Sequence, residues 1–124
     1  MASTNGVINA IMPGPITLIL KKKEVVEAWM NDNRETIAIR MACDDNLKQI
    51  IKELGVPVFM TSANKSGEAV CLTCEEIRQK LVVDMIYEAK PLGGLASTIV
   101  DCTNGYKVLR LGALNQEDID RVIK

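Results

Sequence analysis

The sequence contains no histidine among its 124 residues. Without an imidazole base to activate a serine or cysteine, hydrolases of the Ser-His or Cys-His kind are poorly supported. Metal hydrolysis at a histidine-carboxylate site is excluded for the same reason. The remaining classes are reactions carried by positioning and electrostatics, such as transfer to or from a phosphorylated ligand.

The sequence also lacks long apolar runs and an excess of charge. No run approaches the roughly 20 apolar residues of a transmembrane helix, and the first residues do not resemble a signal peptide. We therefore expect a cytoplasmic protein without a membrane partner. The net charge of −1 gives no overall basic field to attract nucleic acid. The one dense basic run, Lys21 to Lys23, is typical of a solvated strand end, with an RNA-contacting patch as the alternative.

Cysteine is sparse, and one C-x-x-C pair occurs, at Cys71 and Cys74. A zinc site would need an all-thiolate set that also uses Cys43 and Cys102. Redox chemistry at the pair lacks a thioredoxin-like context. Reduced thiols are therefore expected, with no bound metal or prosthetic group.

Length and composition indicate one soluble domain over residues 1–124, because a chain of this size can bury a single core. Pro13-Gly14-Pro15 separates the first dozen residues, which are the end of a helix or a linker, from the apolar run ITLIL at 16–20. That run is predicted to be a buried strand. Further strands are predicted at 36–41, 57–60, 82–87, 97–101 and 106–111.

Four helices are predicted between these strands: a short one at 24–30, then segments starting near Asp44 or Asp45, at Thr73 and at Asn115. Gly55 marks the end of the second helix, and residues 31–33 read as a turn. Residues 89–96 are predicted to be flexible. Asn104-Gly105 predicts a hairpin between the last two strands. The expected fold class is therefore α/β, with a twisted mixed sheet of parallel and antiparallel strands and flanking helices.

Polar residues at the ends of predicted strands are the candidate site. The loop TSANKSG, residues 61–67, carries hydroxyls and an amide that could hold phosphate or carboxylate, and an ordinary polar turn is the alternative. Arg40 ends an apolar strand, where it could pair with an anionic ligand or instead with Asp44 or Asp45. Arg110 allows the same two interpretations. The dipeptide Ser97-Thr98 by itself gives little indication of a binding role.

The order of five motifs resembles the C-terminal part of the YrdC family: PGPITLIL, TIAIRM, PVFMTSANKSGE, STIVD and LRLG. The resemblance implies a twisted mixed α/β fold with a concave basic cavity. It also implies synthesis of threonylcarbamoyl-AMP and pyrophosphate from ATP, L-threonine and bicarbonate, with ATP as a substrate accompanied by magnesium. A threonylcarbamoyl-transferase complex would then modify adenosine 37 of tRNA.

The resemblance assigns roles by motif, and it identifies no catalytic residue. Nucleotide-binding positions are Ser62, Asn64, Ser97 and Arg110; positions near threonine and the nucleotide are Arg40 and Thr61. Thr61, Ser66 and Thr17 are the weaker matches, which would shape the loop or strand.

Two departures from the family pattern limit the prediction. Arg40 is followed by Met-Ala-Cys-Asp-Asp in place of the family's x-P-D-H-P. The N-terminal portion, with its threonine-rich turn and K-x-R cations, is missing. We therefore expect a half-site with weak or no synthase activity alone, and a homodimer through an exposed sheet edge. The alternative function is a nucleotide- or double-stranded-RNA-binding module without catalysis, using Lys21 to Lys23 and Arg40.

Overall fold

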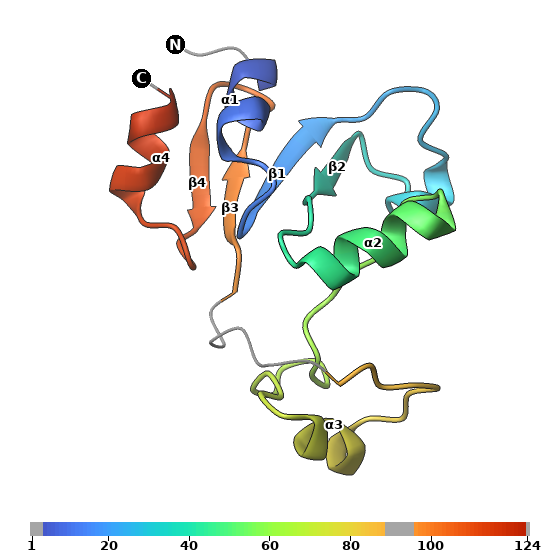
Figure 1. Cartoon of the computed structure of the whole chain (residues 1–124). Helices are drawn as coiled ribbons and strands as arrows, with labels where there is room; N and C mark the ends of the chain where they lie inside the picture. The colour runs from blue at the N-terminus through green and yellow to red at the C-terminus, as the bar shows by residue number, and fades with distance from the viewer. Residues whose placement is uncertain (1–3, 89–95, 124) are drawn as a thin grey trace. The chain divides into compact units, whose positions relative to one another are not determined.

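The structure is a computed structural model that describes residues 4–88 and 96–123 (Figure 1). The chain divides into two compact units. Unit 1 comprises residues 1–56 and 97–124, and unit 2 comprises residues 57–96. The loop predicted at 89–96 lies, except for its last residue, outside the described residues. Within the described ranges, no helix combines the length and apolar character needed to cross a bilayer.

Unit 1 is built on a four-stranded sheet in the order β2-β1-β3-β4. The strands are β1 (Ile16–Lys21), β2 (Thr36–Ile39), β3 (Thr98–Asp101) and β4 (Lys107–Arg110). β1 pairs with β2 in antiparallel and with β3 in parallel orientation, and β3 pairs with β4 in antiparallel orientation. The predicted mixed sheet is confirmed, as is the hairpin around Gly105, whose φ of 74° is left-handed.

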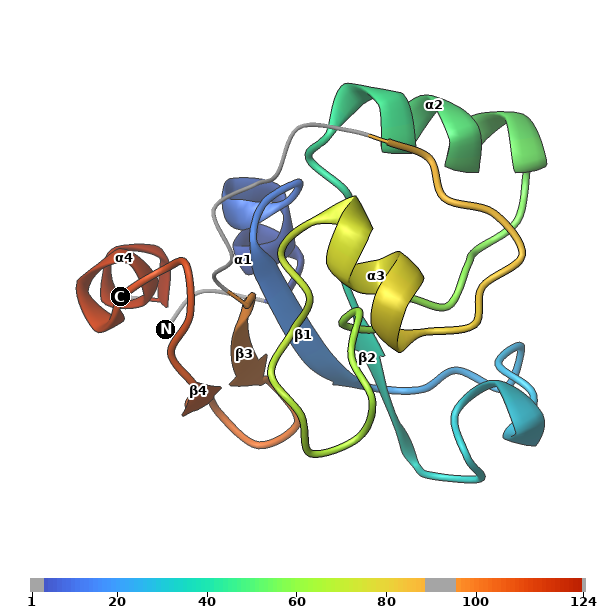
Figure 2. The same cartoon turned by 90° about the horizontal axis from the view of Figure 1, so that it is seen from below.

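Helices α1 (Thr4–Ile11) and α4 (Gln116–Ile123) contribute to the core of unit 1 (Figures 1 and 2). Alternate residues of β1 and β3 point to this core, as the two-residue period of a strand requires. The buried cluster consists of Val7, Met12, Ile16, Leu18, Val100 and Ile119. One face of the sheet is thus apolar, and the odd-numbered residues of β1 lie on the other face.

The predicted capping residues start and stop the helices. Asp44 accepts a hydrogen bond from the Leu47 N–H at 2.8 Å and begins α2 (Asp45–Leu54), which ends at the left-handed Gly55. Asn115 accepts one from the Asp118 N–H at 2.9 Å and begins α4. The sequence predicts these helix ends correctly because each capping side chain satisfies N–H groups within the same turn.

The predicted helix at 24–30 is wrong. Only one turn of 3₁₀ helix, η1 (Ala28–Met30), forms there, and Val25 and Trp29 are exposed. No side chain caps the start of this turn and none of its residues is buried, so neither a cap nor packing stabilises a longer helix. The turn predicted at 31–33 is present, with positive φ at Asp32 and Asn33.

Unit 2 contains α3 (Cys74–Lys80), which Thr73 caps by accepting from the Glu76 N–H at 3.1 Å. The strands predicted at 57–60 and 82–87 are wrong, because both segments are irregular and pair in no ladder. Phe59 is 75% exposed and Met85 is 85% exposed. A β-branched or apolar run becomes a strand only where a neighbour supplies hydrogen bonds.

Candidate functional site

Three side chains from distant parts of the sequence meet at the start of β1 and β3. The hydroxyls of Thr17 and Ser97, 80 residues apart, are hydrogen-bonded at 2.7 Å. Arg110 donates from Nε and Nη2 to the Ser97 carbonyl oxygen, at 3.1 and 2.8 Å, and Nη2 lies 3.4 Å from the Ser97 hydroxyl. The guanidinium is exposed and has further N–H donors for a ligand. We call Thr17, Ser97 and Arg110 the sheet cluster.

Thr98 fixes the backbone beneath this cluster. Its side chain is fully buried, and its hydroxyl donates to the Leu114 carbonyl at 2.6 Å. The same oxygen accepts from the N–H groups of Gly112 and Leu114 at 2.9 and 3.0 Å. Thr98 therefore ties the segment after β4 to the start of β3, and it positions Ser97 on the opposite face of the strand.

The sheet register places the second predicted arginine in the same row. Thr17 pairs with Ile99, which pairs with Arg110. On the other side, Ile39 pairs with Leu18, so Arg40 follows at the position opposite Thr17. Three strand spacings of about 4.8 Å separate the ends of this row by about 14 Å. Arginines thus stand at both ends of a row whose centre consists of Thr17 and Ile99, and the Thr17 hydroxyl is hydrogen-bonded to that of Ser97.

Arg40 does not make the ion pair that the sequence offers as an alternative. Its side chain is exposed, and no described residue forms a salt bridge with it. Asp44, the suggested partner, instead caps α2. Arg40 therefore remains available for an anionic ligand.

An acidic residue occupies the next row of the same face. Asp101 pairs with Ile19 and Lys107. Its carboxylate accepts from the Thr103 hydroxyl at 2.6 Å and the Thr103 N–H at 2.9 Å. These bonds, and to a smaller extent the charge of Lys107, lower the pKa of Asp101. The anion is thereby held at the hairpin and away from the sheet cluster.

The TSANKSG loop, in unit 2, is organised by its own side chains. The Ser62 hydroxyl donates to Asn64 Oδ1, and Asn64 Nδ2 donates to the carbonyls of Lys65 and Glu68 at 2.9 and 3.1 Å. Thr61, Ser62 and Lys65 are exposed. The loop thus presents hydroxyls and a lysine on a backbone that Asn64 holds in place.

The basic residues of the RNA-binding alternative, Lys21 to Lys23 and Arg40, lie at opposite ends of the β1–β2 ladder. Lys21 pairs with Thr36, whereas Arg40 follows Ile39 at the other end of the β1–β2 ladder. Lys22 donates to the Val26 carbonyl at 3.3 Å, as expected of a solvated strand end. Four residues of strand separate the two groups by about 13 Å.

The cysteines and acidic residues form no evident metal site. All four thiols are free, and burial raises the pKa of Cys102, with a smaller contribution from Asp101. Among residues 4–88 and 96–123, no group of three or more potential ligands could hold a metal ion.

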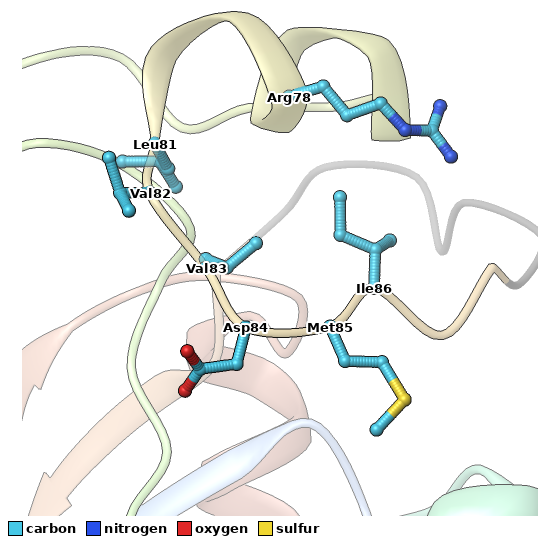
Figure 3. Close-up of a pocket in the computed structure, with 7 residues that line it drawn as sticks. All are labelled: Arg78, Leu81, Val82, Val83, Asp84, Met85 and Ile86. Carbon is cyan, nitrogen blue, oxygen red and sulfur yellow. The ribbon is translucent and has the colours of Figure 1, made fainter.

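Unit 2 also has an open pocket of about 490 Å³ beside α3. Figure 3 shows Val83 and Ile86 pointing toward the helix and Asp84 and Met85 pointing away from it. Arg78 lines the pocket but is paired with Glu88. Since its walls are mainly aliphatic and contain none of the predicted site residues, this pocket is not the candidate site.

The sequence reasoning underrated two residues. Thr17 was a weak match, yet its hydroxyl is bonded to Ser97. The dipeptide Ser97-Thr98 indicates little by itself, although the Thr98 hydroxyl makes three hydrogen bonds beside the cluster. The available signal was a threonine at the first or second position of a buried strand, where a hydroxyl needs a partner.

The family model for Sua5, YciO and YrdC proteins, described as "Telomere recombination", matches residues 2–112. The threonylcarbamoyl-AMP synthase of Wigglesworthia glossinidia brevipalpis is 33% identical over 102 residues, which make up 81% of this chain and 52% of that protein. The threonylcarbamoyl-AMP synthase of Pyrococcus abyssi is 31% identical over 115 residues, 90% of this chain and 34% of that protein.

Solved structures show the same fold. P. abyssi Sua5 complexed with L-threonine superposes with a TM-score of 0.85 at 28% identity, covering 96% of this chain and 36% of that one. E. coli YciO gives a TM-score of 0.80 at 27% identity, covering 90% and 57%. The chain spans about half the length of the threonylcarbamoyl-AMP synthases of Wigglesworthia glossinidia brevipalpis, Idiomarina loihiensis and Pseudoalteromonas translucida.

Proposed function

Because the chain belongs to the Sua5/YciO/YrdC family, we propose that it forms part of the ligand site of a threonylcarbamoyl-AMP synthase. The observation that carries the proposal is the sheet cluster with Arg40 in the same row. Its hydroxyls and arginines suit an adenylate, whose phosphate needs cationic donors. Ser62, Asn64 and Thr61 of the TSANKSG loop are proposed to contact the nucleotide as well.

The proposed reaction needs positive charge rather than a nucleophilic side chain. L-threonine and bicarbonate form a carbamate with loss of water. A carbamate oxygen then attacks the α-phosphorus of ATP, the bond to the β-phosphate breaks, and pyrophosphate leaves. The arginines would stabilise the charge that develops on phosphate oxygens, a contribution often worth several kcal/mol. The absence of histidine does not obstruct this chemistry.

We propose that this chain alone binds ATP but catalyses little formation of threonylcarbamoyl-AMP. Two arginines at the ends of one row, with the TSANKSG loop, provide few cations for a triphosphate. Uncompensated phosphate charge raises the barrier to transfer. We therefore expect measurable ATP binding and little threonine-dependent pyrophosphate release from this polypeptide by itself.

Calorimetric titration with ATP, with and without L-threonine and magnesium, tests the proposal. Arg110→Ala should weaken ATP binding by roughly tenfold to a hundredfold, since a charge-assisted contact is worth about 1.5–3 kcal/mol. Arg34→Ala is the matched control, because Arg34 is an equally exposed arginine of unit 1 outside the row. Absence of binding by the folded chain, or equal weakening by the two substitutions, would contradict a specific site.

The RNA-binding alternative stays a prediction. Steep loss of affinity for double-stranded RNA with salt, in a chain that does not bind ATP, would favour it over the synthase site. The cytoplasmic location, expected from the lack of a transmembrane run and a signal peptide, and the tRNA-modifying partner complex, implied by the resemblance, likewise remain predictions.

A further inference from the structure

The hydroxyls of Thr17 and Ser97 are joined by a hydrogen bond in which either oxygen could be the donor. Because a hydroxyl has a single proton, the direction of this bond decides which side chain keeps a proton for a ligand. Arg110 fixes the direction. Its guanidinium carries only donors, and its Nη2 lies 3.4 Å from the Ser97 hydroxyl oxygen.

Arg110 and Thr17 reach Ser97 from opposite sides. Ser97 immediately precedes β3, which lies between β1, the strand of Thr17, and β4, the strand of Arg110 (Figure 1). The positive guanidinium attracts the hydroxyl oxygen of Ser97 and repels its proton, so this proton points toward Thr17. Ser97 therefore donates to Thr17 Oγ1, and Thr17 keeps its own proton.

The two hydroxyls also differ in exposure. Ser97 is only 7% exposed, and both its carbonyl and its hydroxyl oxygen accept from Arg110. Thr17 is partly exposed, and among the described residues Ser97 is the only hydrogen-bond partner of its hydroxyl. The hydroxyl of the buried Thr98, by contrast, makes three bonds inside the fold, as a structural hydroxyl normally does. Thr17 is thus the more accessible donor.

A cation stands on the other side of Thr17. Arg40 follows Ile39 at the position of β2 opposite Thr17. Its side chain is exposed and forms no salt bridge with any described residue. Because neighbouring strands lie about 4.8 Å apart, an oxygen bound by the Thr17 hydroxyl is within reach of the long arginine side chain. One anionic oxygen can therefore accept from both groups.

We propose that Thr17 donates its hydroxyl proton directly to a phosphate or carboxylate oxygen of the ligand, held between Thr17 and Arg40, and that Ser97 acts through Thr17. The inference rests on the proposed function and deepens it, since the family resemblance gives Thr17 only a part in shaping the strand. Each hydrogen bond of the chain from Arg110 through Ser97 to Thr17 strengthens the next by roughly 10–30%. The charge of Arg110 thereby acts at the centre of the row, where Thr17 and Ile99 are uncharged.

Calorimetric titration of the chain with ATP, and separately with L-threonine, tests the contact. Thr17→Val keeps the shape of the side chain and should weaken binding at least roughly tenfold, as expected for a lost hydrogen bond to a charged group. A loss for ATP alone identifies a phosphate oxygen, and a loss for L-threonine alone identifies a carboxylate oxygen. Thr17→Ser keeps the donor and should stay within roughly threefold of the parent. Thr17→Ala, a second variant without the hydroxyl, should reproduce the loss if Thr17→Val does not fold.

Ser97→Ala separates a relay from a direct contact. Alone, it should weaken binding by no more than roughly threefold, because only the polarisation of Thr17 is lost. Added to Thr17→Val, it should cause no further loss. A larger loss in Ser97→Ala than in Thr17→Val, or full affinity of Thr17→Val for both ligands, would overturn the assignment and leave the proposed function intact. Failure of the folded parent to bind either ligand would overturn the proposed function and this inference together.

Discussion

The sheet cluster and the TSANKSG loop use similar polar groups but are held in different ways. Thr17 and Ser97 are separated by 80 residues, and Arg110 of β4 reaches Ser97 at the start of the neighbouring β3. In the loop, Ser62 and Asn64 are two residues apart, and Asn64 reaches Glu68 four residues on. The cluster therefore exists only when unit 1 is folded, whereas the loop geometry depends on local hydrogen bonds. Single substitutions should therefore disturb the sheet cluster or the loop without disturbing the other.

Thr98→Val should cause the largest loss of stability, and the loss should be confined to unit 1. The substitution keeps the shape of the side chain but removes the partner of the Leu114 carbonyl and of the Gly112 and Leu114 N–H groups. Buried backbone groups left unpaired should cost about 3 kcal/mol. Urea unfolding followed by circular dichroism measures this. Thr61→Val, at an exposed position of unit 2, is the control and should change stability by less than about 0.5 kcal/mol.

Gly14→Ala should cause the next largest loss of stability, because an added Cβ would lie 2.7 Å from the Ile11 carbonyl oxygen. Displacing the turn before β1 should cost about 2 kcal/mol and shift Thr17. Gly67→Ala in the loop meets no atom within 4 Å but retains a φ of +83°, so it should cost about 1 kcal/mol. Equal stability of Gly14→Ala and the parent in thermal unfolding would contradict the role given to this turn.

Asn64→Ala should loosen the loop without affecting the sheet. The Glu68 and Cys71 amides, bonded to the carbonyls of Lys65 and Ala63, should exchange about fivefold faster, as expected for a loss of roughly 1 kcal/mol. The Cys102 amide, bonded to Ile19 of β1, is the internal control. Faster exchange there as well would show that the loop and the sheet are not independent.

Asp101→Ala should give the smallest change, visible mainly as a pH effect. The pKa of Asp101 is lowered in the folded chain by Thr103. Its contribution is therefore complete above the unfolded pKa of about 3.9 and is lost as pH falls through the lower folded pKa. Melting temperatures measured from about pH 6 to pH 2.5 should fall less steeply in the variant. Parallel curves would mean that Asp101 does not stabilise the hairpin at any pH.

The features predicted correctly are those that depend on neighbouring residues. Asp44, Thr73 and Asn115 cap helices because each satisfies an N–H group three residues ahead. The hairpin around Gly105 follows from the left-handed φ of that residue. The order of motifs also predicted Ser97 and Arg110 as ligand-binding positions, and local turn chemistry predicted the TSANKSG loop; these assignments stay predictions.

The features that the sequence could not settle depend on partners elsewhere in the chain. Residues 57–60 and 82–87 have the composition of strands, yet neither lies in a ladder. Arg40 could pair with Asp44, with Asp45 or with a ligand; among the described residues it forms no salt bridge, and Asp44 instead caps α2.

The sequence by itself determined the local elements, their caps and the family motifs, because those depend on contacts within a few residues. The tertiary structure decided which strands pair, that Thr17 meets Ser97, and that Arg40 and Arg110 end the same row. It also left β2 and α2 exposed. The physical reason is that a strand edge, an apolar stripe or a buried hydroxyl is satisfied by a partner whose position in the sequence no local pattern specifies.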